Sequence, residues 1–274
     1  MHTSKSTVSK IAGAVTLGWS DSPKGRQRIR AAVSRTVRAA LRLRSRPFSP
    51  GAIGTALVVA PHPDDETLGC GGTVALLARS KVRLFVAFIT DGGASHPSHA
   101  LYTPGMIAEI RKAEAKSAAA ILGLEPDRLF FLDAKDGTLA GLHGKGKALI
   151  AARVADMILE TKPDAILLPC RRDGSSEHDA AFLIVADALA RAGLRPRLLE
   201  FPIWARRNPL LLLKPMLTSR IIWRHAFPQM RDLKTMAIDA YASQLRPIAP
   251  EGTPALPPDL ASEFCRPEEF LFEQ

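Results

Sequence analysis

Short apolar runs alternate with longer amphipathic stretches over the middle of the chain. The runs are rich in β-branched and aromatic residues, as buried strands are, and stretches with helical spacing separate them. We expect strands at 56–60, 82–90, 128–132, 165–170 and 197–203, and helices at about 69–80, 105–123, 144–161 and 178–192. This alternation predicts βαβ units, and therefore an α/β, Rossmann-like fold with a mostly parallel sheet covered by helices on both faces.

Two segments depart from this rhythm. Between residues 26 and 50, apolar side chains recur every four positions among arginines, which is typical of a basic amphipathic helix. These apolar positions are Ile29, Val33, Val37 and Leu41. The second segment, 208–228, is apolar and interrupted by prolines, and it fits either a pair of core helices or an exposed apolar lip for a hydrophobic substrate.

Charge sets the N-terminal segment apart from the rest of the chain. Residues 1–50 hold eleven Lys and Arg side chains against one acid, Asp21, which accounts for the whole net charge of +10. We therefore interpret 1–48 as a basic extension, helical or disordered, and 49–274 as the folded domain. The extension could be solvated or make peripheral contact with an anionic membrane. A neutral body carries no electrostatic footprint for nucleic acid, so we expect none to bind.

The rest of the composition narrows the cellular setting. Three cysteines (Cys70, Cys170, Cys265) lie far apart, which does not indicate a disulfide framework. No apolar run approaches the roughly 18 residues of a membrane span. We expect a cytoplasmic protein, at most peripheral to a membrane, whose partner is a small molecule. The sequence does not indicate an oligomeric state.

The densest cluster of reactive side chains follows the first predicted strand, in "VVAPHPDDETLGCGG" (58–72). Three consecutive acids repel one another, and the carboxyl end of a parallel strand is where sites form in such sheets. His62 and Asp65, three apart on a turn, can face one point, and imidazole with carboxylate is a common zinc-binding set. A divalent cation would offset the repulsion. Asp64 would point elsewhere and could accept a proton from metal-bound water. The alternative is a solvated acidic turn.

A third ligand is expected from another strand end, because a catalytic zinc keeps three protein ligands and an open position. The natural candidate is His178 in "PCRRDGSSEHDAA" (169–181), a loop at the same edge of the sheet. His96 and His99, in the loop after the second strand, could also reach the site.

Several segments together resemble the LmbE/PIG-L deacetylases, which are metal-dependent hydrolases that remove acetyl groups from molecules containing N-acetylglucosamine. The resemblance runs from about residue 55 to the C-terminus. It rests on "HPDDETLGCGG" (62–72), "TDGGAS" (90–95), "RKAEAKSAAAILG" (111–123), "FLDAKDG" (131–137), "KTMAIDAYASQ" (234–244) and "FCRPEEFLFE" (264–273). It implies that His62, Asp65 and His178 bind Zn2+, or another divalent metal such as Fe2+, and that Asp64 is the general base. It also implies de-N-acetylation of an amino-sugar conjugate by metal-activated water.

One departure from the family pattern concerns the downstream loop, which commonly reads Asp-x-His-x-Asp-His. Here "DGSSEH" (173–178) has Ser175 at the position of the first histidine and Glu177 in place of aspartate. A weakly active or non-catalytic member that binds a sugar or lipid, or a deacylase of another amide or ester, therefore stays open beside the deacetylase. The residues expected to line the substrate pocket are Asp91, His96, Arg111, Asp173 and Ser175. Arg111 and Glu114, one helical turn apart, also fit a structural ion pair.

Overall fold

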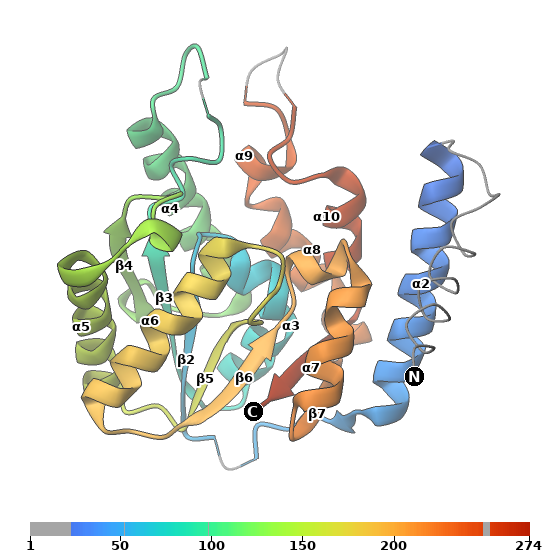
Figure 1. Ribbon diagram of the computed structural model, residues 1–274, viewed down its shortest axis with the longest axis horizontal. Coiled ribbons are helices and arrows are strands. Elements are labelled where there is room, and N and C mark those ends of the chain that lie inside the picture. Colours follow the sequence, from blue (N-terminus) through green and yellow to red (C-terminus); the bar gives the residue numbers. More distant parts are fainter. Residues whose placement is uncertain (1–22, 52, 98, 249–252) are drawn as a thin grey trace, which may run out of the picture.

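The computed structural model describes residues 23–51, 53–97, 99–248 and 253–274, with side chains from residue 28 onward. Its centre is a sheet in which five parallel strands lie in the order β6-β5-β2-β3-β4 (Figure 1). They are β2 (Thr55–Ala60), β3 (Arg83–Thr90), β4 (Leu129–Ala134), β5 (Ala165–Pro169) and β6 (Arg197–Phe201). The predicted α/β fold with a mostly parallel sheet is confirmed.

Three strands that the sequence patterns did not predict extend this sheet. They are β1 (Arg46–Pro47), β7 (Ile221–Ala226) and β8 (Glu268–Glu273), and β8 lies antiparallel between β6 and β7. The interpretation of 208–228 as a helix pair is thus wrong for its second half. Its first half forms a 3-10 turn (Pro209–Leu212) and α7 (Leu213–Thr218), where Leu210 and Leu217 are exposed. Pairing with β8, which lies far along the chain, decides the conformation of β7.

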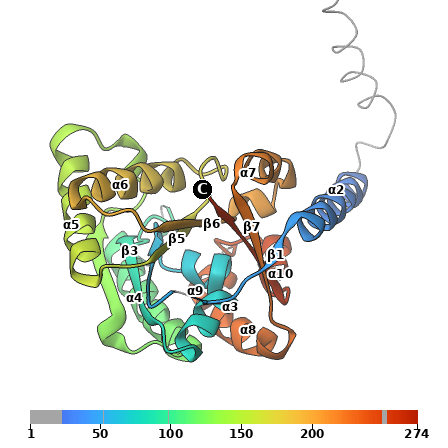
Figure 2. The same ribbon diagram turned by 90° about the horizontal axis from the view of Figure 1, so that it is seen from below.

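Helices cover both faces of the sheet (Figure 2). One face packs against α3 (Asp65–Arg79), α4 (Pro104–Leu122) and α8 (Arg231–Asp239), and the other against α5 (Gly144–Thr161) and α6 (Ser176–Ala192). Alternate residues of β2 are buried on opposite faces of the sheet. Val58 packs in the apolar core on the first face, and Leu57 and Val59 pack in the core on the second. Burial on both faces explains why β2 reads as a continuous apolar run.

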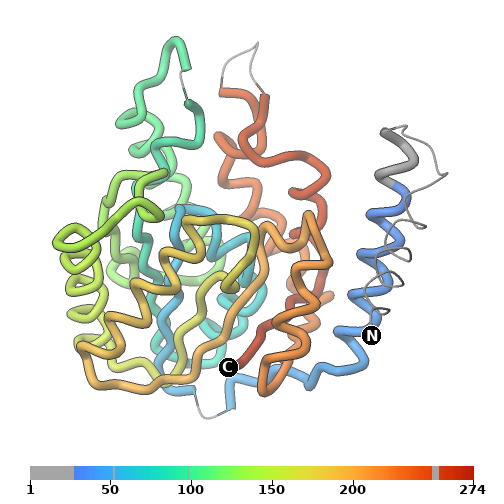
Figure 3. Tube along the Cα trace, in the orientation of Figure 1, coloured from blue at the N-terminus to red at the C-terminus, as the bar shows by residue number. Residues whose placement is uncertain are grey.

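The N-terminal helix α2 (Pro23–Arg44) lies beside elements from the C-terminal end of the chain (Figure 3). Val37 and Leu41 are buried in a third apolar cluster, whereas Ile29 is about half exposed. The chain then passes through β1, which pairs with β7 at the edge of the sheet. The division between 1–48 and 49–274 stays a prediction. Among the described residues, no helix is long and apolar enough to cross a membrane.

Helix α3 approaches the sheet very closely. A Cβ atom on Gly69 would lie 2.1 Å from Cδ2 of Phe201, and one on Gly72 would lie 2.4 Å from Cε1 of Phe227. No side chain fits in these gaps, so the glycines let the helix pack directly on the aromatic rings. The helix starts at Asp65, and this close packing fixes where the acidic loop before it must lie.

A buried ion pair stabilises a kink in α3, where Cys70 has non-helical torsion angles. The Lys234 ammonium donates to the carbonyl oxygen of Leu68 and to Oε1 of Glu269, at 3.0 and 2.6 Å. Glu269 in turn accepts from the amides of Gly72 and Thr73, both at 2.8 Å. The pair therefore satisfies the backbone groups that the kink leaves free on each side.

We predict that Gly69→Ala lowers the free energy of unfolding by about 1–3 kcal/mol, the usual cost of overpacking a filled site. Urea unfolding of the full chain would measure it. Gly141→Ala is the matched control, because a Cβ there meets nothing within 4 Å. Equal stability of the two variants would contradict the close packing of α3 on Phe201.

Candidate metal centre and active site

The loop that joins β2 to α3 places a strained residue at the edge of the sheet. Asp64 precedes the first turn of α3 with φ 145° and ψ −26°, a region that residues with a side chain rarely occupy. Its amide donates to Oε2 of Glu66 at 3.1 Å, and its carbonyl oxygen accepts from Thr67 and Leu68. These bonds hold the conformation and turn the Asp64 carboxylate away from that of Asp65.

Each of the three adjacent acids has a separate set of partners. Asp64 forms an ion pair with Arg111, with Oδ2 and Nη2 2.9 Å apart. Asp65 lies between the imidazoles of His62 and His178. Glu66 is buried and accepts from the hydroxyl groups of Tyr241 at 2.6 Å and Thr67 at 2.5 Å. The expected repulsion is thus resolved by different neighbours for each carboxylate.

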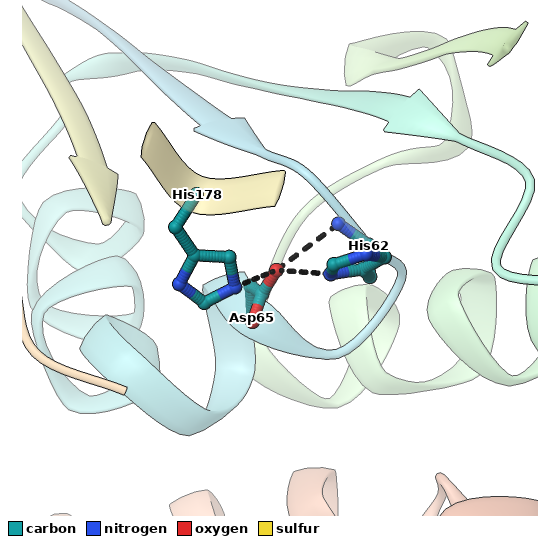
Figure 4. Close-up of side chains that lie close together, drawn as sticks. All are labelled: His62, Asp65 and His178. Atoms are coloured by element: carbon teal, nitrogen blue, oxygen red, sulfur yellow. Dashed lines mark hydrogen bonds and ion pairs between the residues drawn. The ribbon is translucent and has the colours of Figure 1, made fainter. Parts of the chain in front are cut away.

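His62, from the loop between β2 and α3, and Asp65, at the start of α3, meet His178 from the first turn of α6 (Figure 4). Oδ2 of Asp65 lies 3.2 Å from Nδ1 of His62 and 3.5 Å from Nε2 of His178. On its other side, the His62 ring lies 3.2 Å from Oδ1 of Asp136. The predicted ligand set is therefore brought to one point.

His178 is held from behind by Asp173. Nδ1 of the histidine lies 2.9 Å from Oδ2 of Asp173, and both side chains are buried. The same carboxylate accepts from the amides of Ile203, Trp204 and Ala205 at 2.8–3.2 Å. A carboxylate behind a ligating histidine fixes the ring and its tautomer, so Asp173 positions His178 and does not face the pocket.

The carboxylates of this cluster favour positive charge beside them. Burial lowers the pKa of His178, but Asp65 and Asp173 outweigh burial and raise it to about 10. Burial likewise lowers the pKa of His62, and hydrogen bonds with Asp136 and Asp65 raise it to about 9. Burial raises the pKa of Asp65, yet the positive charge of His178 and the charge and hydrogen bond of His62 leave it lowered. A bound cation would satisfy the same carboxylates in place of the two imidazole protons.

The donor set fits a metal ion. Ligand atoms of His62, Asp65 and His178 lie within 4.8 Å of one another, and so do those of a second set, His62, Asp136 and Glu177. Nε2 of His178 is buried with no hydrogen-bond partner among the described residues, although it faces Asp65. An unpaired buried nitrogen beside a carboxylate and a second imidazole is what a ligating histidine presents.

An open pocket adjoins this centre. Its polar lining, called here the polar wall, contains Ser95, Arg111, Asp136 and Gln244, and its apolar lining, the apolar wall, contains Leu68, Ile203, Trp204 and Leu256. His62, Asp64 and Asp65 also line it. Of the five residues that the sequence suggested for the substrate pocket, only Arg111 lines it.

The other four lie close by in different positions. Asp91 accepts from the amides of Gly93 and Asp136 and so organises the loop beside the pocket. His96 stays in that loop and contacts Ser95, which lines the pocket in its place. Ser175 is the N-cap of α6, and its hydroxyl accepts from the amide of His178 at 3.4 Å. Asp173 lies behind the His178 ring, to which it is bonded.

The expected ion pair between Arg111 and Glu114 is not formed. Arg111 reaches Asp64 and also donates to the carbonyl oxygens of Gly92 and Pro63. Glu114 instead accepts from the amide and hydroxyl groups of Ser243, both at 2.7 Å. Sequence reasoning also missed Asp136 and Tyr241 as site residues. Both lie in segments that resemble the family, 131–137 and 234–244, and this resemblance was the signal that could have identified them.

Comparison with known proteins identifies the family. Residues 57–189 match the profile of the PIG-L family, described as GlcNAc-PI de-N-acetylase. The chain carries a PIG-L family domain. A similar protein is a probable N-acetyl-alpha-D-glucosaminyl L-malate deacetylase 2 of Bacillus cereus, 27% identical over 69% of this chain and 82% of that protein. A diacetylchitobiose deacetylase of Thermococcus kodakarensis is 28% identical over half of each chain.

Solved structures share the fold of this chain. An N,N'-diacetylchitobiose deacetylase from Pyrococcus horikoshii superposes with a TM-score of 0.60 at 17% identity, covering 89% of this chain and 92% of its own. GalB, a 4-carboxy-2-hydroxymuconate hydratase from Pseudomonas putida, superposes with a TM-score of 0.58 at 19% identity, covering 77% and 82%. Proteins named for two different reactions therefore share this fold, and the site residues must decide the chemistry.

We predict that Asp173→Asn weakens Zn2+ binding about 10- to 100-fold, because an amide nitrogen would face the backbone donors and the His178 ring would lose its anchor. Competition with a chromophoric chelator would measure the affinity. Asp187→Asn, further along α6 in an ion pair with Arg191, is the control and should bind Zn2+ as the unmodified chain does. Unchanged affinity in Asp173→Asn would count against His178 as a ligand.

Proposed function

We propose that this protein is a metal-dependent hydrolase that removes the N-acetyl group from an N-acetylglucosamine-type sugar or conjugate. The observation that carries the proposal is the meeting of His62, Asp65 and the fully buried His178 beside an open pocket, which His62, Asp65 and the Asp64 carboxylate line. The names of the relatives, deacetylases of amino-sugar compounds, agree with it.

A divalent cation held by His62, Asp65 and His178, zinc or another such as Fe2+, would supply a Lewis acid and lower the pKa of a bound water to about 7. Asp64 would accept the proton of the attacking water and pass it to the leaving amine. Burial raises the pKa of Asp64, and Arg111 lowers it in part, which leaves it at about 7. A carboxyl group with such a pKa can exchange a proton in both directions near neutral pH.

Arg111 gives Asp64 its orientation. The guanidinium contacts the Asp64 carboxylate and the carbonyl oxygens of Pro63, in the loop after β2, and Gly92, in the loop after β3. These contacts keep the Asp64 carboxylate from turning away. A Cβ on Gly92 would lie 2.8 Å from Nη1 of Arg111, so only glycine lets the arginine come this close. Fixed geometry of this kind places the base within reach of the water that it must deprotonate.

The pocket walls suit an amino sugar. Hydroxyl groups need donors and acceptors, which the polar wall offers through Ser95, Asp136 and Gln244. The carbon face of a sugar ring, or an apolar group attached to it, could pack on Trp204 and Leu256. We therefore propose a small amino-sugar conjugate as the partner of this site.

A weakly active or non-catalytic binding protein is the second candidate, and Ser175 favours it. Relatives are thought to use a histidine there to stabilise the transition state, and loss of such a donor costs on the order of a hundredfold in rate. Here the Ser175 hydroxyl caps α6 instead. The strained, arginine-bound Asp64 opposes this candidate, because a purely structural metal site has no use for a spare base. A deacylase of another amide or ester would use the same groups.

Peripheral contact of the basic extension with an anionic membrane, and a cytoplasmic location, stay predictions. Three arginines of α2 form ion pairs with the body of the protein, which leaves fewer charges for such a surface than the sequence suggested. Those residues are Arg30, Arg38 and Arg42.

We predict that the protein releases acetate from at least one N-acetylglucosamine conjugate, that a chelator abolishes the release, and that Asp64→Asn lowers kcat about 10²- to 10⁴-fold. Acetate release from a panel of conjugates, with metal content determined in parallel, would test this. Asp133→Asn, at an exposed aspartate paired with Lys112, is the control and should keep full activity. Full activity in Asp64→Asn, or no release from any conjugate by a chain with metal bound, would overturn the proposal.

A further inference from the structure

We propose that helix α2, although it lies outside the family match and does not line the pocket, sets the position of the pocket's apolar wall. The inference deepens the proposed function, because the wall would bind the substrate of that same pocket. It rests on how α2 is attached, on what lies beneath it, and on how those elements reach Trp204 and Leu256.

Ion pairs attach α2 to the C-terminal part of the chain. Arg38 Nη2 lies 2.7 Å from Oε2 of Glu263 in α10 (Pro258–Phe264). Arg42 makes two bonds to Glu268 in β8, at 2.7 and 2.9 Å, and Arg30 pairs with Asp259 at the start of α10. The Arg38 and Glu263 side chains are only 17% and 23% exposed, so solvent screens this pair less than an exposed one.

Apolar contacts join α2 to the segment that follows β6. Val37 and Leu41 belong to one buried cluster with Ala205, Leu212 and Met216. Ala205 is the residue next to Trp204 of the pocket wall, and its amide is one of those that bind Asp173. The backbone that carries the Trp204 ring is therefore packed between α2 on one side and the Asp173 carboxylate on the other.

A half-buried arginine, Arg206, links the two wall segments under α2. Arg206 donates to the carbonyl oxygen of Pro202, in its own segment, and to that of Glu263 in α10. Its guanidinium also lies 5.2 Å from the centre of the Phe264 ring. Together with Val37, Arg38 and Leu41 of α2, Arg206 lines a small cavity between the helix and the body.

The second wall residue, Leu256, lies immediately before α10. Its amide donates to the carbonyl oxygen of Gln244, and the next residue, Pro257, is the N-cap of the helix. Displacement of α10 would therefore move Leu256. Both apolar residues that α2 can influence, Trp204 and Leu256, line the pocket from segments that follow β6 and precede α10. The proposed metal ligands and Asp64 belong to the β2, α3 and α6 ends.

Because the apolar wall and the metal centre belong to different segments, a role of α2 in placing the wall can be distinguished from a general effect on stability. Arg38→Glu places a negative charge opposite Glu263 and Glu268. We expect it to raise KM about fivefold, by loss of a partly buried ion pair. Zn2+ affinity and kcat should change less than KM, because the amides of Trp204 and Ala205 still hold Asp173 behind His178. Arg38→Lys keeps the charge and should largely restore KM. Arg35→Glu makes the same charge change at an exposed position of α2 and should have no effect.

A second readout does not depend on activity. In a chain that carries Trp19→Phe and Trp223→Phe, Trp204 is the remaining tryptophan. Arg38→Glu should shift its emission to longer wavelength and increase its quenching by acrylamide, and Arg38→Lys should reverse both changes. Thermal unfolding of each variant would show that the compared chains are folded at the temperature of the assay.

The outcomes separate this inference from the proposed function. An unchanged Trp204 signal in Arg38→Glu would overturn the inference, whatever the activity. A changed signal with unchanged KM would also overturn it, because the wall would then not affect substrate binding. A changed signal in a chain that releases no acetate from any conjugate would support the coupling of α2 to the wall and reject the proposed hydrolase.

Discussion

The structure around the site depends on giving three adjacent carboxylates different directions and different partners, so that they do not repel one another. Asp64 faces Arg111, Asp65 faces two imidazoles, and Glu66 turns inward to the Tyr241 hydroxyl. The consequence appears in their pKa values, which burial raises for Asp64 and Glu66 while the imidazoles lower that of Asp65. Neighbouring carboxyl groups that titrate differently can take different roles, and in the proposed function Asp65 would bind the metal while Asp64 would accept a proton.

Many of the groups that maintain this arrangement come from the end of the chain. Tyr241 holds Glu66, and the buried pair of Lys234 and Glu269 holds the kink of α3 just beyond it. Gly69 and Gly72 let α3 pack close enough for these contacts. The family match ends at residue 189, so a chain cut there would lose the groups that keep the acids in place. The antiparallel strand β8 is thus as necessary to the site as the parallel strands that carry it.

The sequence predicted the parallel half of the sheet and the candidate ligands because both depend on local patterns. Buried parallel strands read as apolar runs, and a site loop follows such a run directly. Strands β7 and β8 escaped prediction because each is defined by pairing with distant residues rather than by its own alternation. Arg111 was matched to Glu114 for the same reason. Spacing along a helix shows which residues share a face, and the partner of Arg111 is Asp64, in another segment.

The division of the chain also bears on how related proteins can differ in substrate. The groups proposed for the chemistry, from His62 to His178, all lie inside the family match, whereas Trp204, Leu256 and α2 lie outside it. Residues at the metal centre are tied to one another by short contacts, so a change at one disturbs the others. The apolar wall contacts the centre through few groups, chiefly the amides that bind Asp173. Variation of the wall can therefore change what binds while the geometry around Asp64 and the metal ligands persists.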